Sequence, residues 1–133
     1  TMNSNSQLKI DNSFGSIGTV VVVDGTINLS SNAKVHSTSA NPKGYILIAT
    51  TLISPTNGIT VNSSKNVGVL YALDSNLHLN SNAVLIALAA NRLTMDSNAV
   101  LNYDEGLTQA GFSNGPGGSW QIKRGTYKFF NIP

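Results

Sequence analysis

The sequence predicts an all-β fold: a single-stranded right-handed parallel β-helix (β-solenoid) of about five coils with a C-terminal aromatic capping segment. Three observations lead to this prediction. A short motif recurs along the chain, a strand-like run separates successive copies, and the recurrence stops near Tyr103, where an aromatic tail begins. We expect one solenoid domain over residues 1–133. Residues 1–7 would be a polar leader or a cloning remnant, residues 8–103 the coils and residues 104–133 the cap.

The recurring motif is an apolar residue, any residue and a second apolar residue, followed by three small polar residues. Its copies are "LKIDNS", "INLSSN", "ITVNSS", "LHLNSN" and "LTMDSN", which begin at Leu8, Ile27, Ile59, Leu77 and Leu93. A period of two is typical of a half-buried strand, so the apolar positions should point inward. We expect two stacked ladders. One contains the five starting residues, and the other contains Ile10, Leu29, Val61, Leu79 and Met95.

The polar triplet predicts a sharp corner after each motif strand. Asn tolerates left-handed backbone angles better than other residues with a side chain, and Ser or Asp can bond nearby backbone groups. The corner residues would be Asn12, Asn32, Asn82 and Asn98.

The runs between the copies predict further strands. They read "VVVV", "YILIAT", "VGVLYAL" and "AVLIALA", and "AVLNY" follows the last copy. Short stretches rich in Val, Ile, Leu and Tyr favour strands. The stretch "AVLIALAANRL" has real helix propensity, but its alignment with "VGVLYALDSNL" predicts a strand. Residues 36–44 and 54–58 carry Pro and Gly, and we expect them to be loops.

Composition excludes several classes of function. Charged residues make up 11% of the chain and the formal net charge is +2, so no nucleic-acid partner is expected. The chain has no Cys, which excludes disulfides and thiolate metal sites. No apolar run approaches the roughly 20 residues that span a bilayer, so no direct membrane insertion of this segment is expected. The polar, uncharged balance favours an extracellular or bacterial cell-surface location, with the targeting segment outside this chain.

The tail carries a resemblance to a known family. The stop "LNYDEGL", the turn "SNGPGGSW" and the basic-aromatic ending "WQIKRGTYKFF" resemble the C-terminal β-helix region of PilX-like proteins. Those are bacterial surface proteins associated with type IV pili. The resemblance covers about the last third of the chain and implies a cell-surface, non-catalytic role. It implies no particular functional residue.

The acidic residues do not form an obvious catalytic pair. A glycosidase needs two suitably spaced carboxylates. Asp11 and Asp96 take the same corner position in distant coils, whereas Asp104 and Glu105 are adjacent and would point to opposite faces of a strand. For His78, Asp96 is the nearest second metal ligand, and a solvated surface histidine is the simpler interpretation. We therefore expect no enzyme activity, no cofactor and no metal.

The candidate ligand-binding residues lie on one outward face and in the tail. The outward column Thr60, His78 and Thr94, with the parallel column Asn62, Asn80 and Asp96, would form a flat polar face, and Trp120 and Tyr127 could form an aromatic platform. The expected function is a structural or adhesive cell-surface module that contacts pilus or other surface proteins. One alternative is a carbohydrate-binding module of a secreted protein, which binds polysaccharide. A second alternative is a small polysaccharide-active β-helix enzyme.

Overall fold

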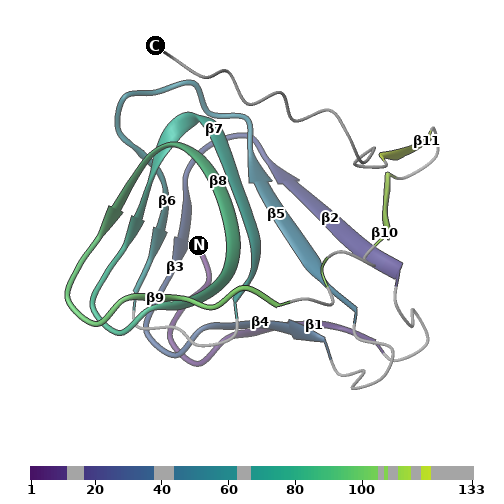
Figure 1. Ribbon diagram of the computed structural model, residues 1–133, viewed down its shortest axis with the longest axis horizontal. Coiled ribbons are helices and arrows are strands. Elements are labelled where there is room, and N and C mark those ends of the chain that lie inside the picture. Colours follow the sequence, from purple (N-terminus) through teal and green to yellow (C-terminus); the bar gives the residue numbers. More distant parts are fainter. Residues whose placement is uncertain are drawn as a thin grey trace, which may run out of the picture.

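The described chain is all-β, and most of its strands are parallel in one curled sheet (Figure 1). The structure is a computed structural model that describes residues 1–11, 17–37, 44–62, 67–104, 107, 111–114 and 118–120. Within these residues no helix is long and apolar enough to cross a membrane. The strands are β1 (Gln7–Ile10), β2 (Ile17–Val23), β3 (Ile27–Leu29), β4 (Lys34–Ser37), β5 (Ile46–Thr50), β6 (Asn57–Val61), β7 (Val67–Leu79), β8 (Val84–Met95), β9 (Val100–Leu101), β10 (Gly111–Asn114) and β11 (Gly118–Trp120).

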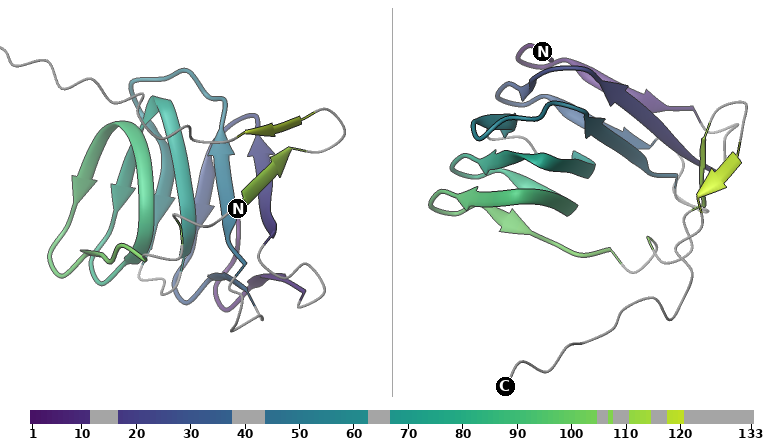
Figure 2. Two further views of the ribbon diagram at one scale, coloured as in Figure 1. Left: turned by 45° about the vertical axis from the view of Figure 1, so that its right-hand side comes forward. Right: turned by 90° about the horizontal axis from the view of Figure 1, so that it is seen from above.

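The curled sheet forms two walls, and a separate two-stranded sheet forms a floor. Wall A consists of β2, β5, residues 67–72 of β7 and residues 87–90 of β8. Wall B consists of β3, β6, residues 76–79 of β7 and residues 92–95 of β8. The floor is the parallel pair β1 and β4. The long strands β7 and β8 bend from wall A into wall B, and Figure 2 shows the resulting layers side by side.

The two predicted ladders are confirmed on wall B for four of their five members. Ile27, Ile59, Leu77 and Leu93 lie in register, as do Leu29, Val61, Leu79 and Met95. The central members are fully buried, with 0% exposure for Ile59, Val61, Leu77 and Leu79. Burying such a side chain stabilises a fold by about 1.5–3 kcal/mol. In the last layer the exposure rises to 38% for Leu93 and 41% for Met95.

The prediction that Leu8 and Ile10 belong to these ladders is wrong. They lie in β1 on the floor, where Leu8 is opposite Val35 and Ile10 opposite Ser37. The motif "LKIDNS" therefore follows a corner, whereas the copies that begin at Ile27, Leu77 and Leu93 precede one. Alternation with a period of two is the same for every half-buried strand, so the pattern alone did not distinguish the floor from wall B.

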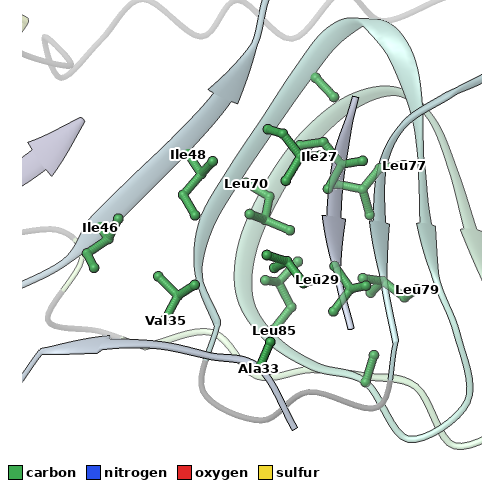
Figure 3. Close-up of a cluster of buried hydrophobic side chains, with 14 of the residues drawn as sticks. Ile27, Leu29, Ala33, Val35, Ile46, Ile48, Leu70, Leu77, Leu79 and Leu85 are labelled. Carbon is green, nitrogen blue, oxygen red and sulfur yellow. The ribbon is translucent and has the colours of Figure 1, made fainter. Parts of the chain in front are cut away.

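Wall A and the floor supply the other side of the core (Figure 3). Ile46 and Ile48 of β5 and Leu70 of β7 point inward toward Leu29 and Leu77 of wall B. The outer side of wall A is also apolar. Val22 and Tyr71 are 61% and 38% exposed there. Strands that are apolar on both faces explain the continuous apolar runs in the sequence.

The predicted asparagine corners are confirmed at Asn32, Asn82 and Asn98. Their φ angles are 61°, 63° and 62°, in the left-handed region. Asn12 lies outside the described residues. The prediction missed a fourth corner, at Asn5, with a φ of 64°. Each corner is closed by the same backbone hydrogen bond, donated by Ser6, Ala33, Ala83 and Ala99 to the residue three positions earlier, at 3.0, 2.9, 3.0 and 3.1 Å.

The opening residues therefore take part in the stack. Met2 forms a parallel bridge with Leu29, and it packs against the core cluster. The N–H of Met2 donates to Asn28 O at 2.8 Å, and Ser30 N donates to Met2 O at 3.0 Å. The segment 1–7, predicted as a polar leader, thus contains a wall-B position, a corner and the first residue of β1.

The predicted strands between the copies are confirmed, with changes at their ends. The stretch "AVLIALAANRL" lies almost entirely in β8, so its register with β7 outweighs its helix propensity. The predicted loop 36–44 begins too early, because β4 continues to Ser37, and residues 38–43 lie outside the described part. The predicted loop 54–58 ends too late, since β6 already begins at Asn57.

The described part of the tail lies at the β2 edge of the sheet. β10 pairs in parallel with β2 at Ile17 and Gly18, and β11 pairs antiparallel with β10. This edge belongs to the first layer, on the opposite side of the sheet from β8 and β9. The side chains of Phe112 and Trp120, and the whole of residues 121–133, lie outside the described part of the structure.

Candidate functional site

The outer face of wall B brings six of the predicted site residues together. Thr60, His78 and Thr94 occupy one row, in register with Asn28 of the first layer. Their neighbours along each strand are the buried ladder residues, so strand alternation turns this row outward. The row is uniformly polar, unlike the outer face of wall A.

Asn62, Asn80 and Asp96 form the second row, and they directly follow the wall-B strands β6, β7 and β8. Their N–H groups donate to Leu29 O, Val61 O and Leu79 O at 2.8, 2.9 and 2.9 Å. The nearly equal distances show that the layers keep one register through the strand ends. The second row therefore repeats at the strand spacing of about 4.8 Å.

Side-chain amides connect this face along the stack. Asn62 Nδ2 donates to Asn28 Oδ1 at 3.0 Å, and Asn80 Nδ2 donates to Asn62 Oδ1. An amide both donates and accepts, so a stack of Asn residues can form a continuous ladder. Asn28 was not among the predicted site residues. The signal for it was the position in the motif that it shares with Thr60.

In the layer after Asn80, the second row has Asp96 in place of another asparagine, and its partner is His78. His78 Nε2 lies 3.0 Å from Asp96 Oδ1, and the two side chains are 26% and 42% exposed. Because a carboxylate only accepts hydrogen bonds, Nε2 of His78 carries the hydrogen and donates it to Asp96 Oδ1. With Thr60 and Thr94 on either side, the pair offers hydroxyl, imidazole and carboxylate groups on one open surface.

The described residues contain no cluster of three or more His or acidic residues that could hold a metal ion. The wall-B face offers hydrogen-bonding side chains. Of the two predicted aromatic residues, Trp120 lies at the end of β11 with its side chain outside the description, and Tyr127 is outside it altogether. Neither can be placed beside the polar rows.

A contact that sequence reasoning missed joins the second layer to the chain beyond β9. Tyr45 OH donates to Asp104 Oδ1 at 3.0 Å, across 59 positions of sequence. Burial, and then the neighbouring Asp104 carboxylate, raises the pKa of Tyr45 to about 12. The bond joins the segment after β9 to the residue directly before β5.

Comparison with curated proteins and with solved structures gave no match. A family model did match, over residues 1–110, and this span includes both walls, the floor and the polar face. The match covers most of the chain, and the family is described as a domain of unknown function. The chain therefore belongs to the DUF7305 family.

Proposed function

We propose that this chain is a right-handed β-solenoid of about five coils that serves as a non-catalytic structural and adhesive module at a bacterial cell surface. The solenoid architecture is supported by the register of wall B, where four successive layers place equivalent residues opposite one another. A stack of this kind is rigid along its axis and exposes long, regular faces.

One observation carries the adhesive role. The outer face of wall B presents two polar rows, in which the Asn28, Asn62 and Asn80 amides are bonded from layer to layer and His78 is bonded to Asp96 of the next layer. Groups that are held in place before contact lose little conformational entropy on binding. Such a face suits weak, repeated contacts with another surface.

Adhesion can be tested with purified chain on immobilised bacterial or host-cell surfaces. The variant Thr94→Lys places a long charged side chain in the first row, and Thr94 is exposed. The control Lys34→Thr changes charge on the floor, at another exposed position. Adhesion that falls only in the first variant supports the role of the wall-B face. Equal adhesion of both variants and the original chain argues against it.

Association with type IV pili rests on the resemblance of the tail to PilX-like proteins. If this part of the proposal holds, the chain should co-sediment with sheared pili and stay in the supernatant when pilus-free cells are treated identically. Recovery in the same fraction with and without pili would remove pili from the proposal and leave the adhesive role to the test above.

A carbohydrate-binding module is the second candidate, and His78 with Asp96 favours it. Sugar hydroxyls both donate and accept, which matches an imidazole, a carboxylate and two threonine hydroxyls on one open surface. A glycan array separates the two candidates. Retention of particular glycans that is lost in His78→Ala supports carbohydrate binding, whereas no retention at all contradicts it.

A further inference from the structure

The last layer of wall B forms an edge of the sheet among the described strands. Residues 92–95 of β8 pair with β7, and no other described strand pairs with them. Leu93 and Met95 are 38% and 41% exposed although their partners in register, Leu77 and Leu79, are 0% exposed. On the neighbouring β9, Val100 and Leu101 are 40% and 45% exposed. An apolar open edge of this kind is a template for pairing with another strand.

The backbone polarity of this edge is known from the bonds inside the stack. Asp96 N donates to Leu79 O at 2.9 Å, so the N–H of Asp96 and the backbone groups of Thr94, two positions earlier, are directed toward β7. Successive residues of a strand alternate in this direction. The N–H and C=O groups of Leu93 and Met95 therefore face outward, away from the stack.

The five residues at the edge are complementary to themselves when read in the opposite direction. They are Arg92, Leu93, Thr94, Met95 and Asp96. In an antiparallel pair centred on Thr94, Arg92 lies opposite Asp96, Leu93 opposite Met95, and Thr94 opposite its own copy. The same register makes the Leu93 and Met95 pairs hydrogen-bonded, because these are the residues whose backbone groups face the edge.

We propose that this edge pairs antiparallel with the same edge of a second copy, about a two-fold axis that passes through the wall at Thr94. If this axis is perpendicular to wall B, the inner faces of the two walls lie on the same side of the joined sheet. Leu93 of each copy then lies beside Met95 of the other copy. Both charges are exposed, with 42% exposure for the Asp96 side chain, and each Arg92 meets the Asp96 of the other copy. The His78 bond to Asp96 Oδ1 holds that carboxylate in place.

The opposite end of the stack does not offer the same partner surface. At the first layer, β10 and β11 extend wall A beyond β2, and Met2 pairs with Leu29 of wall B. A symmetric contact uses the same patch on both copies and closes after two subunits. The geometry therefore favours a dimer in which the last layers of two copies meet. It disfavours a filament in which the last layer of one copy meets the first layer of the next.

Disulfide trapping tests the two-fold position directly, because the chain contains no Cys. Non-hydrogen-bonded antiparallel neighbours have Cα atoms about 4.5 Å apart, within the range of about 4.4–6.8 Å that a disulfide spans. Thr94→Cys should therefore form a cross-linked dimer in a glutathione redox buffer. The control Thr60→Cys lies in the same row but has a strand on each side, and it should stay monomeric. Equal cross-linking of the two variants would overturn the proposal.

Exchanging the charges of Arg92 and Asp96 tests the register of the proposed strand pair. Analytical sedimentation of the full chain measures the dimer dissociation constant. Arg92→Asp and Asp96→Arg each place like charges opposite one another twice per dimer, so each should raise the dimer dissociation constant by at least about tenfold. The double variant R92D/D96R restores opposite charges and should return the constant to within about threefold of the original. A monomer at all concentrations, or a double variant as weak as the single ones, would overturn the proposal. Arg92→Asp alone carries the test if the corner variant Asp96→Arg does not fold.

Discussion

Tyr45 donates its hydroxyl hydrogen to Asp104 Oδ1 at 3.0 Å and thereby fastens the chain that leaves the last layer to the second layer. Tyr45 is 3% exposed, so most of its surface is shielded from water. An unpaired buried hydroxyl is costly, and hydrogen bonds to charged groups contribute about 1.5–3 kcal/mol. The contact thus joins two segments 59 positions apart through a hydrogen bond to a charged group.

We expect this contact to make the protein sensitive to alkaline pH. The folded state raises the pKa of Tyr45 from 10.0 to about 12. The unfolded chain therefore loses the proton first. The stabilisation is fully present below pH 10 and is lost as the pH rises to about 12, by about 1.4 kcal/mol per pH unit within that window.

Urea unfolding between pH 8 and 12 measures this loss. Tyr45→Phe removes the ionisable group, so its free energy of unfolding should be lower at pH 8 and should fall less steeply above pH 10. Tyr71→Phe is the matched control, since Tyr71 lies on the outer face of wall A and is 38% exposed. If the free energy of unfolding fell equally with pH in Tyr45→Phe and in the original chain, Tyr45 would not be the source of the alkaline sensitivity.

The asparagine corners give a second prediction. Asn82 has a φ of 63° and an exposed side chain, so its role is conformational. Asn82→Ala should lower the free energy of unfolding by about 1–2 kcal/mol, because a Cβ without a polar group disfavours the left-handed region. Asn82→Gly should cost clearly less, since glycine adopts this region freely.

Thermal unfolding of the two variants side by side checks the corner prediction. Asn91→Ala, at an exposed position within β8, is the control for loss of an asparagine outside a corner. An alanine variant as stable as the glycine variant would show that the left-handed angle is not what selects asparagine at position 82.

Wall B could be predicted from the sequence because two independent signals coincide there. Alternation places Ile59 and Val61 inward, and the polar corner after the strand sets where the next layer begins. The floor lacks the second signal. Leu8 and Ile10 show the same alternation, but the corner at Asn5 precedes them, and it was hidden in a segment that looked like a leader. Register there follows from tertiary pairing with β4.

Part of the polar face could also be predicted. The neighbourhood of His78 and Asp96 followed from layer spacing, and the structure places them 3.0 Å apart. The contact of Tyr45 with Asp104 could not be predicted, because nothing local in either segment refers to the other. The position of β10 beside β2 is a similar case, since the tail returns to the first layer and not to the edge where the repeat stops.

The ladder offers a comparison of one substitution in two environments. Leu77 and Leu93 occupy the same ladder position in adjacent layers, with exposures of 0% and 38%. Leu77→Ala should destabilise the fold by about 2–5 kcal/mol, because it leaves a cavity that its neighbours cannot fill. Leu93→Ala should cost about 1 kcal/mol in dilute solution, where the edge is solvated.

Chemical denaturation at low protein concentration measures the difference between the two leucine variants. At high concentration the cost of Leu93→Ala should increase, because the proposed dimer buries this side chain. Equal costs for the two leucines in dilute solution would contradict the layered burial of the ladder.

The close approach of β5 and β7 gives the last prediction. Gly68 is buried, and a Cβ at this position would run into the backbone carbonyl of Ile46. A backbone atom within a paired strand cannot move aside as the end of a side chain can. Gly68→Ala should therefore separate β5 from β7 locally and lower the free energy of unfolding by about 2–3 kcal/mol, in the range of overpacked cores.

Val69→Ala, one position along and pointing to the outer face of wall A, should cost about 1 kcal/mol or less. Denaturant midpoints of the two variants check this order. A Gly68→Ala variant as stable as Val69→Ala would mean that the two strands are not held at this separation.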